Sequence, residues 1–319
     1  MTSDYPRDRL EIIVVDGMSD DGTRTITAAY AERHPWIAVR DNPARITPVA
    51  LNLGIAQARG AIVMRMDAHC WYPPNYISGL VSWLDKSAAD NVGGVCITLP
   101  GAKTPVARAI AVGLSHPFGV GNAYFRIGSA QARWVDTVPF GCYRREVFER
   151  IGLFDEELPR NQDDEFNHRL VSRGGRVLLA PGIVSWYYAR ESLRQLWRMF
   201  YQYGYFKPLV LRKVGRILTL RQVVPSLFIL ALIGFATLAP WSTALGTLGA
   251  MLAAAYAVTT VGSALPTVFK HGTACGIALC FVFPVMHMSY GMGFLRGVLH
   301  FLVLRGTAGP QIHATPLSR

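Results

Sequence analysis

Apolar and amphipathic stretches alternate along the first part of the chain. Apolar runs of strand length occupy residues 10–16, 37–40 and 61–66, and stretches with helical spacing at residues 23–34 and 47–58 separate them. A strand–helix–strand order predicts parallel strands joined by right-handed crossovers. We therefore expect an α/β domain built on a parallel sheet.

The same kind of pattern continues as far as residue 188. Further elements are expected at residues 72–84 (helix), 92–98 (strand), 135–143 (strand and turn), 144–151 (helix), 161–173 (helix) and 176–181 (strand). Residues 103–125 are rich in Gly and Ala and follow neither period, so we interpret them as a flexible loop over the functional site.

The last third of the chain is apolar over long distances. The stretch from Gln222 to Phe269 contains no charged residue, which is more than one buried helix needs and enough for two membrane spans of ~20 residues each. A third apolar stretch contains Pro284 and His287, which favour either a span or a re-entrant segment. Two to three transmembrane helices are therefore expected, at residues 223–239, 243–265 and 274–295.

The charge of the chain is unevenly distributed. All 21 Asp and Glu residues lie at or before Glu191, so the net charge of +11 comes from the segment after it. Basic and aromatic residues mix at 192–222, directly before the uncharged stretch. That position favours an interfacial membrane segment over a nucleic-acid surface, and we expect no nucleic-acid partner.

These patterns predict a division of the chain. The expected parts are a catalytic domain at 1–191, interfacial helices at 192–222, a membrane region at 223–305 and a tail at 306–319. The five cysteines are scattered without a C-x-x-C pair, which indicates a reducing compartment, and the polar first residues predict no signal peptide. We expect a multi-pass protein of the cell (inner) membrane with a cytoplasmic catalytic domain.

Side chains suited to chemistry follow two of the expected strands. Asp16 ends the first strand, and Asp67 and His69 follow the strand at 61–66. Ligands of α/β sheets gather at such strand ends, and the period of two in extended chain points Asp67 and His69 to one side. A carboxylate and an imidazole there could share a divalent cation that holds a diphosphate. The alternative is a solvated strand end without a ligand.

Three adjacent acids, Asp163, Asp164 and Glu165, open the helix at 161–173. Acids in a first helical turn are favoured by the helix dipole, so capping alone is one interpretation. Capping explains one or two acids, but it explains three adjacent acids less well. Neighbouring helical residues point about 100° apart, so only one of two adjacent acids can face a site.

Five motifs in this order resemble the inverting glycosyltransferases of family 2. They are Val15-Asp16-Gly-Met-Ser-Asp-Asp-Gly-Thr23, Ala50-Leu-Asn52-Leu-Gly54, Ala58-Arg-Gly60, Arg65-Met-Asp67-Ala-His69 and Gln162-Asp163-Asp164-Glu165. The resemblance runs from about residue 11 to 207 and is greatest to the succinoglycan-type exopolysaccharide glucosyltransferases. It implies the GT-A (Rossmann-like) nucleotide-sugar-binding sheet, followed here by C-terminal transmembrane helices.

The resemblance also implies roles for single residues. Asp16 would contact the uracil or ribose, and Asp67 would bind the sugar diphosphate and its metal, Mn or Mg. His69 stands where the family usually has a second Asp, and Asp163 stands at the place of the catalytic base. Further residues implied in the nucleotide-sugar and catalytic sets are Arg45, Asn52, Arg198, Asp164 and Glu165.

Two departures from the family pattern affect what is implied. Met199 replaces the Trp of a Gln-x-x-Arg-Trp motif, so processive synthesis is not implied. The apolar strand and Pro-x-x-Asn-Glu turn that the family places before Asp16 are missing. We therefore expect an N-terminally truncated sheet, through either a late start or a true truncation.

The implied activity is transfer of a sugar, glucose by resemblance, from a UDP-sugar to a lipid-linked saccharide acceptor in the membrane during cell-surface polysaccharide synthesis. Polysaccharide-assembly proteins are the implied partners. The alternative is a catalytically impaired truncated homologue that acts as a membrane assembly protein. A nucleotidyltransferase would need a Gly-rich, basic phosphate loop near its start, and none is present there.

Overall fold

The first two expected strands are present and parallel. β1 (Ile12–Asp16) and β2 (Ile37–Asp41) pair along their whole length, with Asp16 opposite Asp41, and helix α1 (Thr23–Arg33) connects them. They form a two-stranded sheet of their own. The computed structural model describes residues 3–215 and 219–307.

The third strand belongs to a second sheet, so the expected single parallel sheet is wrong. Helix α2 (Thr47–Gln57) leads to β3 (Ile62–Met64), which pairs antiparallel with β7 (Cys142–Arg144). The second sheet has the order β3-β7-β5-β8-β4, and β6 pairs with β8. The physical reason lies in β7: Cys142 and Tyr143 are buried and fit between β3 and β5. Local periodicity does not reveal such a distant partner.

The remaining elements of the first part agree largely with the expected ones, except that no element was expected at residues 7–9 or 70–71. They are η1 (Arg7–Arg9), β4 (Cys70–Trp71), α3 (Tyr76–Lys86), β5 (Asn91–Leu99), β6 (Arg133–Val135), α7 (Glu146–Ile151), α8 (Gln162–Ser172) and β8 (Val177–Tyr188). Strand β8 continues past its expected end, and Gly182 inside it has φ 76°, a conformation that favours glycine.

The core of the second sheet lies under helix α3. Tyr76, Leu80 and Leu84 recur at every fourth position and are almost fully buried. They pack with buried sheet residues that include Val92 and Leu178. This apolar contact fixes the sheet whose β3 end carries the candidate site. Truncating such a buried Leu to Ala typically costs about 2–5 kcal/mol.

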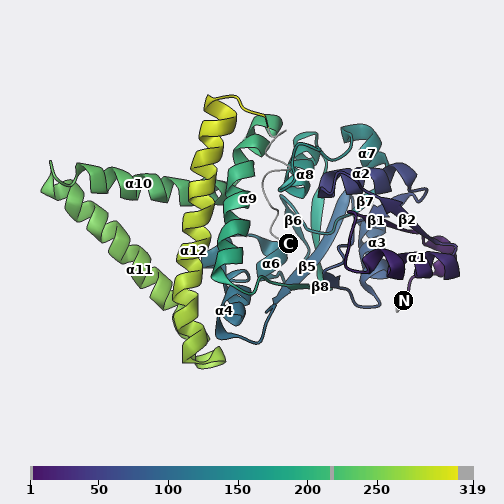
Figure 1. Ribbon diagram of the computed structural model, residues 1–319, viewed down its shortest axis with the longest axis horizontal. Coiled ribbons are helices and arrows are strands. Elements are labelled where there is room, and N and C mark those ends of the chain that lie inside the picture. Colours follow the sequence, from purple (N-terminus) through teal and green to yellow (C-terminus); the bar gives the residue numbers. More distant parts are fainter. Residues whose placement is uncertain (1–2, 216–218, 308–319) are drawn as a thin grey trace. The chain divides into compact units, whose positions relative to one another are not determined.

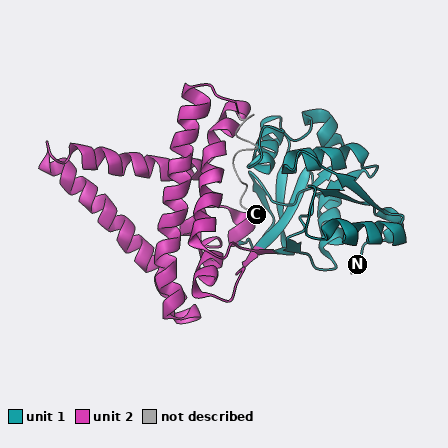
Figure 2. Ribbon diagram, viewed as in Figure 1, with its two compact units in different colours: residues 1–96, 128–186 teal, residues 97–127, 187–319 magenta. Residues whose placement is uncertain are grey.

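The chain divides into two compact units (Figure 2). One comprises residues 1–96 and 128–186, and the other comprises residues 97–127 and 187–319. The units differ from the linear division expected at residue 191 because residues 97–127 group with the C-terminal helices. Residues 308–319 of the expected tail lie outside the described residues.

The flexible loop expected at 103–125 is wrong, because this segment is mostly helical. It forms α4 (Pro105–Gly113), α5 (Pro117–Val120) and α6 (Tyr124–Ile127). The Thr104 hydroxyl accepts a hydrogen bond from the Ala107 N–H (3.1 Å), which caps α4. Small apolar residues then bury α4 against other helices of its unit.

Helices α9 (Leu193–Val214) and α12 (Thr273–Gly297) lie side by side (Figure 1). Glycines allow their backbones to approach closely. A Cβ on Gly204 would collide with the carbonyl of Tyr290, and a Cβ on Gly293 would collide with the carbonyl of Tyr201. The pairing resembles the small-residue contacts of helices packed in membranes.

Within the described residues, two helices have the length and apolar composition needed to cross a membrane. They are α11 (Thr243–His271), with 29 residues, and α12 continued by the π-helical η3 (Val298–Val303), with 31 residues together. Helix α10 (Val224–Leu238) is apolar but has only 15 residues. η2 (Leu220–Gln222) precedes it.

Of the two alternatives for the third apolar stretch, the structure has the unbroken helix, because α12 is continuous through Pro284. The ring of His287 is held on both sides, at 2.8 Å from the Tyr256 hydroxyl and at 2.8 Å from the Phe118 carbonyl oxygen. These partners allow a polar side chain to lie inside an apolar helix without interrupting it.

Candidate functional site

A cation and an acid pair directly after strand β3. Arg65 Nε donates to Asp67 Oδ1 at 2.8 Å, and Arg65 Nη2 donates to Asp67 Oδ2 at 2.9 Å. The backbone of Asp67 is fixed as well, because its N–H donates to the Tyr72 hydroxyl at 2.8 Å. Both pairing side chains are largely buried, at 12% exposure for Arg65 and 19% for Asp67.

Asp67 and His69 lie in a turn and not in extended chain. Strand β3 ends at Met64, short of the expected residue 66, and the Cys70 N–H donates to the Asp67 carbonyl at 3.2 Å. The period-two argument for placing Asp67 and His69 on one side is therefore wrong. The two side chains nevertheless interact, because the charge of His69 lowers the pKa of Asp67.

The carboxyl group of Asp67 stays ionised despite its burial. Burial alone raises its pKa, but the charge and hydrogen bonds of Arg65, together with His69, outweigh it, so the pKa lies below its ordinary value. Asp67 is thus an anion at neutral pH in a site that excludes most water.

Asp163 acts on this pair from the start of helix α8. Burial alone lowers the pKa of Arg65, and Asp67 and then Asp163 raise it above its ordinary value. The buried phenol of Tyr143 has its pKa raised by burial and then by Asp163. Asp163 is therefore within electrostatic reach of Arg65, and the fold brings the end of β3 and the start of α8 to one place.

The two acids that follow Asp163 have partners on their own helix. Asp164 Oδ1 lies 3.6 Å from His168 Nε2. Glu165 is buried, and Arg169 donates to its two carboxylate oxygens at 2.7 and 3.0 Å. Their catalytic roles stay predictions, but these contacts give Glu165 a structural function within α8.

Asp16 is a second buried acid, at the end of β1. Its Oδ2 accepts from the Ser19 N–H at 2.9 Å and from Arg24 Nη1 at 3.4 Å. Burial alone raises its pKa, but the hydrogen bonds from Ser19 and the charge of Arg24 lower it below its ordinary value. The Arg45 backbone lies close to neighbouring Gly17 and has φ 58°. Contact of Asp16 and Arg45 with a nucleotide stays a prediction.

Asn52 links α2 to a distant turn. Its Nδ2 donates to the Phe154 carbonyl at 2.9 Å and to Glu156 Oε1 at 2.8 Å, and its Oδ1 accepts from the Phe154 N–H at 3.0 Å. Nucleotide contact by this amide stays a prediction. Arg198 lies on α9 of the other unit, so the site described here is built without it.

The residues at the end of β3 fit a divalent metal as part of a shared site. In the described ranges no group of three or more His, Cys, Asp and Glu side chains gathers as a complete metal site. Asp67 and His69 offer one carboxylate and one imidazole, a donor set that suits Mn²⁺. Diphosphate oxygens and water would have to supply the other ligands.

Sequence reasoning missed Arg65 and Tyr143. The signal for Arg65 was present, because a charged residue interrupts an otherwise apolar strand-length run two positions before Asp67. A charged side chain in such a run needs a partner. Tyr143 gave no local signal, since its role depends on the pairing of β7 with β3.

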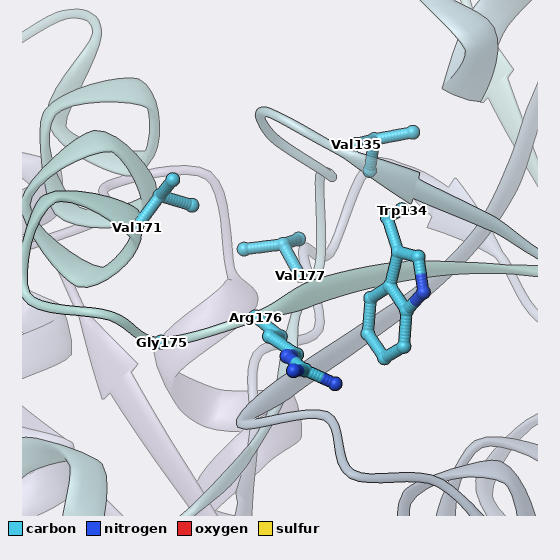
Figure 3. Close-up of a pocket in the computed structure, with 6 residues that line it drawn as sticks. All are labelled: Trp134, Val135, Val171, Gly175, Arg176 and Val177. Atoms are coloured by element: carbon cyan, nitrogen blue, oxygen red, sulfur yellow. The ribbon is translucent and has the colours of Figure 1, made fainter.

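A cavity of about 430 Å³ lies away from these residues (Figure 3). It is lined by Trp134, Val135, Val171, Gly175, Arg176 and Val177. The Arg176 guanidinium lies 5.5 Å from the centre of the Trp134 ring. The acid cluster lies at the start of α8, whereas Val171 of the cavity lies near its end. Because a helix rises roughly 1.5 Å per residue, the cavity is separate from the candidate site.

Comparisons with known proteins identify relatives over most of the chain. Residues 3–152 match the family described as Glycosyl transferase family 2. The succinoglycan biosynthesis protein ExoA of Rhizobium meliloti (strain 1021) is 28% identical over 302 residues, which cover 91% of this chain and 86% of that protein. A dolichyl N-acetyl-alpha-D-glucosaminyl phosphate 3-beta-D-2,3-diacetamido-2,3-dideoxy-beta-D-glucuronosyltransferase of Methanococcus voltae is 27% identical over 218 residues, covering 66% of this chain and 67% of that protein.

A solved structure agrees with the fold. The mannosyltransferase PcManGT from Pyrobaculum calidifontis, in complex with GDP-Man and Mn²⁺, superposes with a TM-score of 0.54 at 23% identity, over 93% of this chain and 79% of that chain. At this identity the likeness shows the fold alone. The α/β part of the chain is therefore of the GT-A type, as the sequence predicted.

Proposed function

We propose that this chain, whose residues 3–152 match the family described as Glycosyl transferase family 2, moves a sugar from a UDP-sugar to a lipid-linked saccharide in the membrane. The observation that carries the proposal is the buried Arg65–Asp67 pair, with Asp163 within electrostatic reach of Arg65. Similarity to the succinoglycan biosynthesis protein supports exopolysaccharide synthesis as the process, and glucose is the sugar that the family resemblance implies.

The donor would lie across the strand ends of the first unit. Asp16 would accept hydrogen bonds from the uracil or ribose, since it is buried and ionised. Asp67 and His69 would hold a divalent metal, Mn or Mg, which would neutralise charge on the diphosphate. Arg45 and Asn52 complete the proposed nucleotide-sugar contacts within this unit.

Asp163 would be the general base. Its charge acts on Arg65 and its Oδ1 accepts from the Asp164 N–H at 2.9 Å, whereas the Asp164 carboxylate lies beside His168 and Glu165 is held by Arg169. In this role Asp163 takes the proton of the acceptor hydroxyl. The oxygen of that hydroxyl attacks the anomeric carbon from the side opposite the leaving nucleoside diphosphate. The configuration at that carbon is thereby inverted.

We expect membranes containing the chain to release UDP from UDP-glucose when lipid-linked saccharide is supplied. Asp163→Asn keeps the shape and removes the base, so turnover should fall by about 10²–10⁴-fold while UDP binding is retained. Asp164→Asn is the matched control and should change turnover much less.

The opposite ranking of these two variants would move the base to Asp164. Equal, near-normal turnover in both would leave the acids as a helix cap. UDP binding without any release in the unaltered chain would instead support a non-catalytic membrane assembly protein.

The helical unit would provide the membrane anchor. Large apolar side chains are exposed along α10 and α11, namely Leu227, Leu230, Ile233, Leu248, Met251, Val258, Val261 and Leu265. We infer a multi-pass protein of the inner membrane with its catalytic part in the cytoplasm. A lipid-linked acceptor stays in the bilayer, so an anchored enzyme meets it without leaving the membrane.

A further inference from the structure

The proposed metal ligand Asp67 already has a cation. Arg65 occupies both oxygens of its carboxylate, at 2.8 and 2.9 Å. Since the two side chains are only 12% and 19% exposed, little water is available to replace the guanidinium if it leaves. A free divalent ion that approaches Asp67 must therefore compete with a positive charge that is bound in two places.

Arg65 has other negative charge within reach. The charge of Asp163, at the start of α8, also stabilises its charged form. The Arg65 Nη1 atom is buried and has no hydrogen-bond partner among the described residues. An N–H donor in this position is free to bind an oxygen that arrives from outside the protein.

The backbone of Arg65 is fixed while its side chain holds Asp67. Its N–H donates to the Gly141 carbonyl at 3.0 Å, which ties residue 65 to the segment before β7. An exchange of partners would therefore involve rotation of the side chain only. The four bonds between the backbone and the guanidinium allow such movement without unfolding of the turn.

We propose that Arg65 is an exchangeable counterion, which keeps divalent metal off Asp67 until a nucleoside diphosphate is bound. The inference rests on the proposed function. The diphosphate brings negative charge that binds the guanidinium through Nη1, and Asp67 is released toward the metal. Metal and nucleotide then bind cooperatively. The diphosphate draws the guanidinium away from Asp67, and the metal in turn takes the place of the guanidinium at that carboxylate.

The test measures binding of Mn²⁺ to the full chain in detergent, by electron paramagnetic resonance and without nucleotide. Arg65→Gln removes the competing charge, so we expect Mn²⁺ to bind about tenfold more tightly or better, the effect of losing one charge-assisted interaction. Arg59→Gln is the matched control. Its side chain is 86% exposed and paired with Glu11, so the affinity should stay unchanged.

Equal or weaker Mn²⁺ binding in Arg65→Gln overturns the inference. Asp67→Asn tests the metal site separately. If it binds Mn²⁺ as the unaltered chain does, the proposed site itself is wrong. If it loses Mn²⁺ while Arg65→Gln gains nothing, only the counterion role fails.

A second arm measures the coupling. Adding UDP or GDP to the unaltered chain should raise its Mn²⁺ affinity, and Arg65→Gln should lose most of this increase. If neither nucleotide changes the affinity of the unaltered chain, the inference is overturned. Should Arg65→Gln fail to fold, Arg65→Lys keeps a charge without the two-pronged geometry and should bind Mn²⁺ more tightly than the unaltered chain. Equal or weaker binding by this variant overturns the inference too.

Discussion

Side chains of the first unit are held by partners far away in the sequence. Asn52 bonds across 102 residues to Phe154. Arg65 is influenced by Asp163, on a different element. The Asn52 bonds tie the middle of α2 to a distant turn, and Asp163 adds negative charge near Arg65. These interactions order the elements around the site, while the Arg65 side chain can still exchange partners.

The Arg65–Asp67 pair should stabilise the fold in a pH-dependent way. The pKa of Asp67 is lowered on folding, so the stabilisation is fully present above the unfolded value of about 3.9 and is lost as the pH falls through the folded pKa. Asp67→Asn should lower the free energy of unfolding by about 1.5–3 kcal/mol between pH 6 and 8.

Melting of the detergent-solubilised chain, followed by circular dichroism, checks this expectation. The difference between Asp67→Asn and the unaltered chain should be constant from pH 6 to 8 and should shrink below pH ~4. Asp41→Asn is the control, because its pair with Arg24 is exposed. A difference that persists undiminished at pH 3 would contradict the assignment.

The sequence predicted the acids of the candidate site but not their neighbours. Asp67 and Asp163 were found because acids stand at a strand end and at a helix start, which are local features. The sequence pattern does not by itself assign Arg65 to the site, because the residue lies in an apolar run of strand length. Its pairing with Asp67 depends on a turn that replaces the expected extended chain. The nearness of Asp163 to Arg65 is a tertiary fact, which no local spacing contains.

Elements were predicted well where the period was regular and poorly where the partner decided the outcome. Helices α1, α2 and α8 agree with the expected ranges to within a few residues. Helix α4 was interpreted as a loop, although Thr104-Pro105 is a recognisable helix start. The split into two sheets could not be predicted, because β3 pairs with β7, which lies about eighty residues further along the chain.

The close contact of α9 and α12 gives a prediction at the scale of elements. Gly293→Ala would place a Cβ against the Tyr201 carbonyl, so the helices must separate. We expect destabilisation of about 1–3 kcal/mol, typical of overpacking. Gly262→Ala is the matched control on α11, because an added Cβ there meets only open space in the described structure.

Melting temperatures of the two glycine variants in detergent give the comparison. Gly293→Ala should melt below the unaltered chain, while Gly262→Ala should be neutral or slightly stabilised, since Ala favours helix. If both behave alike, the closeness of α9 and α12 is not needed for stability.

At the scale of the whole molecule, the exposed apolar face of α11 predicts firm membrane attachment. Carbonate-washed membranes should retain the unaltered chain. Val258→Arg places a charge near the middle of α11, where burial in the bilayer centre costs about 2.5–3.5 kcal/mol, and should lower retention. Trp241→Arg, before the start of α11, is the control and should be retained. Release of the unaltered chain into the soluble fraction would refute the attachment.

The interleaving of the two units limits how the protein can be dissected. Residues 97–127 leave the first unit, complete the helical unit and return. A fragment that stops at residue 191 would keep α4 but lose α12, whose Val282 and Met286 pack against Gly113. Such a fragment would present the bare apolar side of α4 to water and would aggregate. Crystallisation of the first unit alone therefore calls for replacement of residues 100–127 by a short bridging segment, which keeps β5 whole, and not for a simple C-terminal cut.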